Sequence, residues 1–231
     1  MSSSESIMES TSPRRNRTPT LVGLAVALFA LPAFMAIYRS INGDNHSNLE
    51  VLEREFGVFL LVGLLIWIIK RWERLPVTSI GLRFNQLRTS LLRGLWFAAI
   101  VLAVTVGLYL MLRGLGIHLG EEHGAVFHPS LLVVTVSTLR AGIAEEIFYR
   151  GFAFERLQSL TGSKILAGLL PLMIFAISHY RQGVGGVIAA FVLGGILTAF
   201  YIKYRDLSAN MLAHFLADFV LNVALPFFSG R

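Results

Sequence analysis

Ionisable side chains stand inside otherwise apolar segments in the C-terminal half of the chain. Glu146 and Arg150 are four residues apart, so they share one helix face and can form an ion pair. His214 and Asp218 have the same spacing. An ionised side chain at the bilayer centre costs roughly 2.5–3.5 kcal/mol on insertion scales, so such a cluster predicts a functional site. The candidate residues are Glu145, Glu146, Arg150, His179, His214 and Asp218.

These residue types suit hydrolysis. A carboxylate beside a histidine can take a proton from water as a general base, and a donor such as His214 can face the developing oxyanion. Two histidines with a glutamate also match the ligands of a catalytic zinc site. The residues therefore leave two alternatives open, a metal-free glutamate mechanism and a divalent metal such as zinc. The chain has no Cys and no HExxH motif, which excludes a thiol nucleophile and the common zincin arrangement.

The elements that must position these side chains are membrane helices. Of the 231 residues, 55% are hydrophobic and 15% are charged, whereas an average soluble domain has about 25% charged residues. We predict an all-α polytopic transmembrane helical bundle of about seven spans, with residues 1–19 as a disordered cytoplasmic tail and residues 20–231 as one membrane domain. The apolar blocks cover residues 20–38, 56–69, 91–112, 131–150, 165–180, 184–204 and 207–228.

The distribution of charge predicts the orientation. Lys and Arg gather in alternate loops, as in Lys70, Arg71 and Arg74, and in the turn around Gly162, which is expected to hold Arg156 and Lys164, whereas the other loops carry acids. The positive-inside rule then places the N-terminus in the cytoplasm, and the first block is interpreted as a retained anchor. The predicted location is the cytoplasmic membrane of a prokaryote. The net charge of +6 is a topology signal, so no nucleic-acid partner is expected. The loops expected outside hold Asp44, Glu50, Glu53 and Glu55, and also His46, His118, His123 and His128, which we interpret as solvated.

Spacing also predicts which residues lie at one level. Glu145 and His179 are each 17 residues from Gly162, the expected turn between two antiparallel helices, so they should lie at equal height. The first three blocks contain almost no ionisable residue in their interiors, which places the chemistry in the last four. Gly186, Ala190 and Gly194 form a small-residue stripe that predicts close helix packing.

Three motifs resemble those of the CPBP family of intramembrane proteases, which includes CAAX prenyl proteases and bacteriocin-processing proteins. The resemblance covers about residues 75–225, including the segment Ile80-Gly81-Leu82-Arg83. One departure concerns Asp218, because eukaryotic CAAX proteases have Asn at that place. The motifs are Glu145-Glu146-x-x-x-Arg150, Phe175-x-x-x-His179 and His214-x-x-x-Asp218.

The resemblance implies a helical-bundle endopeptidase that cleaves near the membrane-associated terminus of a protein or peptide substrate. It implies that Glu145 activates water and that His179 shares this role. Glu146 and Arg150 would organise the site, and His214 with Asp218 would position the oxyanion or a metal. Two alternatives stay open: a non-catalytic bacteriocin-immunity or scaffolding member of the same family, and an ion-coupled transporter, a class in which internal repeats are common. The expected partners are the substrate and the lipid bilayer.

Overall fold

A computed structural model gives the structure of the protein and describes residues 17–43, 47–117 and 129–224. Within these ranges the chain forms helices and turns and no β-strand, so the predicted all-α class is confirmed. The N-terminal tail predicted for residues 1–19 falls almost wholly outside the described residues, as do His46, His118, His123 and His128.

The described helices join end to end into seven rods, and each rod carries most of one predicted apolar block. Short 3-10 turns, η3 (Val77–Ile80), η4 (Phe84–Gln86) and η6 (Tyr180–Gln182), lie between rods. The rods are α1 (Thr18–Ala25) with η1 (Val26–Ala30) and α2 (Leu31–Asn42); α3 (Asn48–Trp67) with η2 (Ile68–Trp72); α4 (Leu87–Gly114); α5 (Leu131–Arg140) with η5 (Ala141–Phe154) and α6 (Glu155–Thr161); α7 (Lys164–Ser178); α8 (Gly183–Tyr204); and α9 (Leu207–Phe219) with η7 (Val220–Ala224).

Local sequence signals set several helix ends. The Ser47 hydroxyl accepts from the Glu50 backbone N–H, and the Glu50 carboxylate accepts from the Ser47 backbone N–H, which is a complete capping box at the start of α3. Ser163 and Asp206 cap α7 and α9 in the same way through their side chains. Gly162 ends α6 with a positive φ of 71°, a conformation that glycine adopts without strain. The predicted turn at Gly162 is therefore confirmed.

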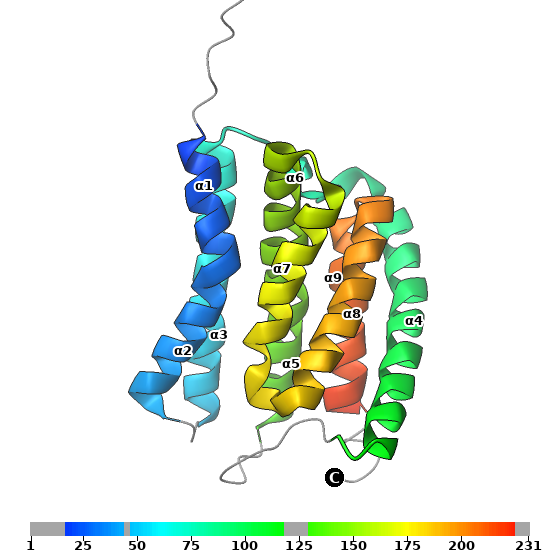
Figure 1. Ribbon diagram of the computed structural model, residues 1–231. Helices are drawn as coiled ribbons and strands as arrows, with labels where there is room; N and C mark the ends of the chain where they lie inside the picture. The colour runs from blue at the N-terminus through cyan, green and yellow to red at the C-terminus, as the bar shows by residue number, and fades with distance from the viewer. Residues whose placement is uncertain (1–16, 44–46, 118–128, 225–231) are drawn as a thin grey trace, which may run out of the picture.

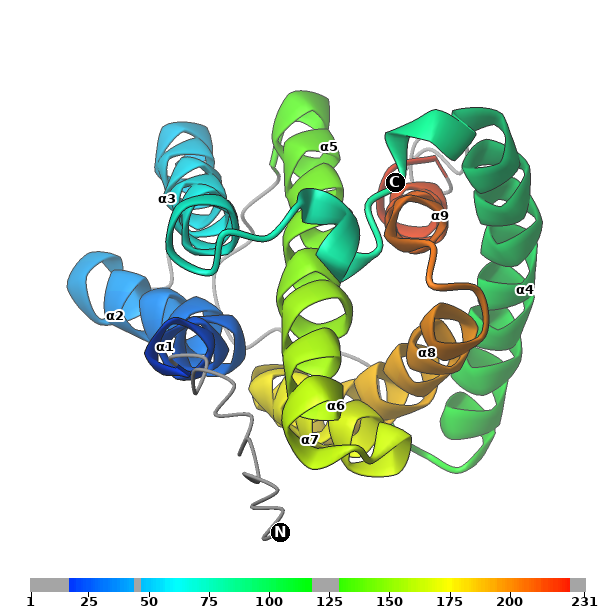
Figure 2. The same ribbon diagram turned by 90° about the horizontal axis from the view of Figure 1, so that it is seen from above.

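The α5–η5–α6 rod occupies the middle of the bundle. Figure 1 shows the helices side by side, with α1, α2 and α3 at one edge and α4 at the other. Seen from above in Figure 2, the central rod lies between α1–α3 and the α8–α9 pair, and η5 contacts α9, α7, η1 and α3. The candidate carboxylates on η5 are therefore surrounded by other helices.

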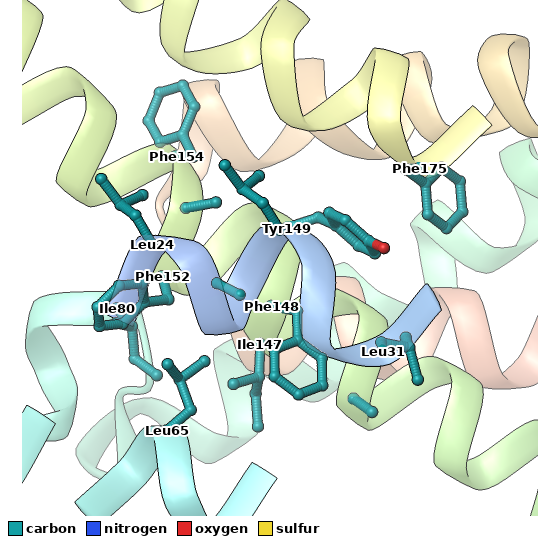
Figure 3. Close-up of a cluster of buried hydrophobic side chains, with 14 of the residues drawn as sticks. Leu24, Leu31, Leu65, Ile80, Ile147, Phe148, Tyr149, Phe152, Phe154 and Phe175 are labelled. Carbon is teal, nitrogen blue, oxygen red and sulfur yellow. The ribbon is translucent and has the colours of Figure 1, made fainter. Parts of the chain in front are cut away.

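Aromatic and branched residues of η5 build the main core. Figure 3 shows Phe148, Tyr149 and Phe152 from the central rod among aliphatic side chains of the N-terminal helices. Gly142 lies so close to α9 that an added Cβ would come within 2.9 Å of the Phe215 backbone nitrogen. A side chain there would push α9 away from η5, and with it the polar residues that face Glu146.

The outer surface of the bundle is apolar. Large side chains such as Trp96, Leu110 and Ile165 are 57%, 61% and 73% exposed. Among the residues that the structure describes, three helical stretches are long and apolar enough to cross a bilayer, namely Thr18–Asn42, Phe84–Gly114 and Tyr180–Tyr204. Lys164–Ser178 and Leu207–Val223 are shorter apolar helices. A surface of this kind is stable in lipid rather than in water, so the chain is a membrane protein.

Two sequence expectations about charged residues are wrong. Glu50, Glu53 and Glu55 do not lie in a loop, because the capping box starts α3 at Asn48 and carries all three into the helix. Arg156 was expected at a turn in the cytoplasm, but it is 6% exposed and its guanidinium bonds the Glu73 carboxylate. Glu55 and Arg156 each have a buried partner of opposite charge far away in the chain, Arg140 and Glu73, which no local pattern reveals.

Candidate active site

The site begins where the central helix changes its hydrogen-bonding pattern. From Ala141 to Phe154 the backbone follows the π pattern, in which each N–H bonds the carbonyl five residues earlier. Across that boundary Arg140 Nη1 donates to Glu145 Oε1 at 3.0 Å, a contact between residues five apart. Segments of π-helix frequently occur at functional sites.

Glu146 lies in a closed polar cluster. Its side chain has no exposed surface, and its Oε1 accepts from Arg150 Nη1 at 3.0 Å, so the predicted ion pair is confirmed. The same oxygen lies 2.9 Å from His214 Nδ1, and Asn210 Nδ2 donates to the other carboxylate oxygen at 3.0 Å. Three donors from two helices therefore surround this carboxylate and leave it no open face.

Arg150 is held on every side. Its Nη2 donates to the Gly194 carbonyl at 3.1 Å, its Nε lies 3.4 Å from the Thr198 hydroxyl, and its guanidinium lies 4.5 Å from the centre of the Phe175 ring. A Cβ on Gly194 would lie 2.9 Å from both the guanidinium and that ring. The packing role predicted for the small-residue stripe is confirmed at Gly194, which leaves space for the arginine.

Glu145, the neighbour of Glu146, faces open space. It lines a cavity of about 600 Å³ and also a second cavity of about 430 Å³. The residues common to both cavities are Arg140, Glu145, His179 and Gln182. Glu145 is therefore a carboxylate that Arg140 holds at one oxygen and that borders two partly open cavities.

His179 lies just beyond the last residue of α7, Ser178, rather than inside a span as expected. Its Nδ1 is 2.8 Å from the Phe175 carbonyl oxygen, which can only accept, so Nδ1 carries the proton and donates. In the neutral ring Nε2 is then an acceptor. His179 lines both cavities together with Glu145, which agrees with the equal heights predicted from the hairpin.

His214 and Asp218 complete the wall of the larger cavity. His214 Nε2 lies 4.0 Å from Glu145 Oε2 and 3.6 Å from Asp218 Oδ2, so the predicted pairing of His214 with Asp218 on one helix face is confirmed. The Asp218 side chain is 34% exposed, whereas that of His214 is 11% exposed. Because Nδ1 of His214 contacts Glu146, Nε2 is the ring nitrogen that faces the cavity.

Four of the six predicted residues, Glu145, His179, His214 and Asp218, line the larger cavity, and Glu146 lies behind them in contact with His214 and Arg150. Two further ionised residues were missed. Glu55 of α3 is fully buried and accepts from Arg140 Nε at 2.5 Å, although it was expected in a loop just before the second apolar block. A count of charges offered a signal: the fourth block, residues 131–150, holds two Arg and two Glu, so Arg140 is its remaining charge beside the predicted three.

The donors were tested against the divalent metal alternative. Glu146 and His214 are bonded to each other, and Arg150 and Asn210 bond the same carboxylate. Among the residues that the structure describes, no three His, Asp or Glu side chains are grouped as metal ligands would be. The described side chains therefore do not fit a resident metal ion.

The fold and site define a class: a helical membrane protein with Glu, His and Arg side chains around a cavity between its helices. Residues 127–220 match the family model of the type II CAAX prenyl endopeptidase Rce1-like proteins, and that range contains all six predicted residues. The resemblance to the CPBP family is thereby confirmed over that range, which is less than half of the chain.

Part of the chain is also similar to a curated protein. The UPF0177 protein YvdC of Lactococcus lactis subsp. lactis is 33% identical over 96 residues, which are 41% of this chain and 36% of that protein. The match thus spans little more than a third of the relative's length. No solved structure matches the chain.

Proposed function

We propose that the protein is an intramembrane endopeptidase that hydrolyses a peptide bond near the membrane-associated terminus of a protein or peptide substrate. One observation carries the proposal: two adjacent glutamates have opposite surroundings. Glu146 is closed by three donors, whereas Glu145 borders two cavities and is bonded through one oxygen only. Two acidic groups in different environments are typical of sites where one carboxylate organises and the other reacts.

In the proposed reaction Glu145 is the general base. Its carboxylate takes a proton from a water molecule in the cavity, and the water oxygen attacks the carbonyl carbon of the peptide bond. The carbonyl oxygen becomes an oxyanion in a tetrahedral intermediate. The bond from carbon to nitrogen then breaks, and the proton passes from the Glu145 carboxyl to the leaving amine. His179, whose Nε2 accepts in the neutral ring, shares the handling of this proton.

The other residues of the set position these groups. Glu146 fixes the His214 ring through Nδ1 at 2.9 Å, and Arg150 fixes Glu146. As an imidazolium, His214 donates from Nε2 to the developing oxyanion, in the manner of an oxyanion hole. Asp218, at 3.6 Å from that nitrogen, supports the charged ring. Their fixed geometry lowers the reorganisation that the reaction needs.

We also propose seven spans with the N-terminus in the cytoplasm, in the cytoplasmic membrane of a prokaryote. The seven described rods and the alternation of basic loops support this topology. The chain has no Cys, so single cysteines can be introduced without background. Asn42→Cys and Thr161→Cys place one thiol at the end of α2 and one at the end of α6, both at exposed residues. A membrane-impermeant maleimide added to intact cells should label the first and not the second; the reverse result contradicts the orientation.

The enzymatic proposal is tested with purified protein in liposomes and a fluorogenic peptide that ends in a prenylated CAAX sequence. An unprenylated copy and a bacteriocin-leader peptide are the comparison probes. Glu145→Gln should lower kcat by about 10²- to 10⁴-fold, the range of a general base. Glu53→Gln changes an exposed glutamate and is the matched control. Undiminished cleavage by Glu145→Gln would refute the assignment and favour a non-catalytic member of the family.

A further inference from the structure

Glu55 is a buried carboxylate outside the three family motifs. It lies on α3, its side chain is 1% exposed, and it accepts hydrogen bonds from three groups: Arg54 Nη2 at 2.6 Å, Ser137 Oγ at 3.0 Å and Arg140 Nε at 2.5 Å. Two of these donors stand on α5. Burying a charged carboxylate costs free energy, which its three donors offset. The ion pair of Glu55 with Arg140 links two helices that are far apart in the sequence.

Arg140 connects this carboxylate to the proposed base. Its Nε donates to Glu55, and its Nη1 donates to Glu145 Oε1 at 3.0 Å. A guanidinium is a planar fork, so a carboxylate on each branch fixes both its position and its plane. The Arg140 side chain is 10% exposed, and what is exposed borders the same two cavities as Glu145.

We infer that Glu55 and Arg140 are positioning residues for Glu145. Glu55 holds the Arg140 guanidinium, which holds Oε1 of Glu145 and thereby directs Oε2 to the cavity side, 4.0 Å from His214 Nε2. Glu55 lies outside the range 127–220 that matches the family model, so the N-terminal helices contribute to the site beyond the family motifs. This inference rests on the proposed function only for its kinetic consequence; the bridge itself is a matter of geometry.

The kinetic test uses the same liposomes and the same prenylated probe. Glu55→Gln and Arg140→Gln should each lower kcat by about 10- to 100-fold, the loss expected when a reacting group is displaced by about 1 Å, and leave KM within about twofold. Arg140→Lys, which keeps the charge, should recover part of the loss. Glu73→Gln breaks a comparable pair of arginine and carboxylate outside the cavities, at Arg156, and should leave kcat unchanged.

A double substitution tests whether the two residues act in series. If Glu55 works only through Arg140, the variant with both Glu55→Gln and Arg140→Gln should be no slower than Arg140→Gln alone. Losses that multiply, or a loss confined to KM, would overturn the inference. Glu55→Asp, which keeps the charge on a shorter side chain, replaces Glu55→Gln if that variant is not monodisperse on gel filtration.

A measurement without substrate separates this inference from the proposed function. Dicyclohexylcarbodiimide reacts with protonated carboxyl groups in apolar surroundings, and an arginine bridge protects a carboxylate from it. Mass spectrometry should find Glu145 modified faster in Glu55→Gln and in Arg140→Gln than in the unsubstituted protein, with no change in Glu73→Gln. Equal rates at Glu145 in all four proteins would refute the bridge. If the unsubstituted protein cleaves no probe, the enzymatic proposal fails and this labelling still decides the positioning role.

Discussion

Two clusters of buried ion pairs stabilise the bundle, one around the cavities and one at the end of the molecule that carries α6 (Figure 1). In the second, the α6-end cluster, Arg156 Nη2 donates to Glu73 at 2.7 Å and Arg93 donates to Asp206 at 3.2 Å. The Glu73 and Asp206 side chains are 2% and 1% exposed, as buried as the Glu146 side chain. The members of the α6-end cluster are Glu73, Ser79, Ser90, Arg93, Glu155, Arg156, Tyr201, Arg205 and Asp206.

The carboxylates of the two clusters differ in whether they border a cavity. Asp206 accepts from Ser90 and Arg93 and also caps α9 through Ala209, and none of these residues lines either cavity. Glu145 has one arginine and a cavity on each side. Buried charge alone therefore marks architecture as readily as chemistry, and a carboxylate bonded on one side that borders a cavity is the sharper sign of a reacting group.

The largest effects should come from removing one arginine of each cluster. Arg150→Met leaves Glu146 buried without its cation, and Arg156→Met does the same to Glu73, so each should destabilise the protein by about 3–5 kcal/mol. Only Arg150→Met should also lower kcat of the molecules that remain folded. Unfolding in a detergent series, with kcat normalised to the folded fraction, distinguishes the two. An equal loss of kcat in both variants would erase the distinction between the clusters.

A smaller effect is expected at Gly194, which touches only the cavity cluster. A Cβ there comes within 2.9 Å of Arg150 Nη2 and of the Phe175 ring. Gly194→Ala should therefore shift the arginine, cost about 1–3 kcal/mol through overpacking and lower kcat by about 10-fold or more.

Gly195→Ala is the matched control for that variant. Gly195 follows Gly194 on α8, and its added Cβ would meet only Leu172 of α7 at 3.6 Å, an ordinary van der Waals contact. This control should gain slightly in stability, because alanine favours a helix more than glycine does. Melting curves and kcat of both variants provide the test. If Gly194→Ala changes neither stability nor kcat, the close packing of Arg150 against Gly194 is contradicted.

Asn210→Ala should produce a moderate loss. It removes the hydrogen bond to the second oxygen of Glu146 and leaves that oxygen buried without a donor, which costs about 1–3 kcal/mol. Because Arg150 and His214 still hold the first oxygen, kcat should fall less than in Arg150→Met. Thermal unfolding and kcat of the two variants provide the test. A loss of kcat as large as that of Arg150→Met would mean that Asn210 contacts the substrate.

The smallest effect should come from Asp218→Asn. Asp218 is partly exposed and lies 3.6 Å from His214, so its charge acts through a weak contact beside the cavity. We expect kcat to change by less than about 10-fold, since a partly exposed ion pair contributes about 1 kcal/mol or less. The initial rate on the prenylated probe measures it. A loss of kcat as large as that of Glu145→Gln would mean that Asp218 takes a direct part in the reaction.

Local patterns in the sequence predicted much of this fold. The apolar blocks located the helices, Gly162 located a turn, and the spacing of Glu146 with Arg150 predicted their ion pair. Partners far apart in the chain were not predictable from spacing. Glu55 and Arg140 are 85 residues apart, and Glu73 and Arg156 are 83 residues apart. No local pattern around one residue of either pair indicates its partner. The capping box at Ser47 could have placed Glu55 on a helix, and its burial still depended on packing against α5.

The junction of the two cavities has a consequence for inhibitor design. Arg140, Glu145, His179 and Gln182 form a boundary common to spaces of about 600 and 430 Å³, and each space is within the usual size of a small-molecule pocket. Two weak fragments, one for each space, need only a short linker across that boundary. A short linker gives the second fragment an effective concentration in the millimolar range. A bivalent compound of this kind would gain affinity without any new contact and would cover the glutamate that lies between its two halves.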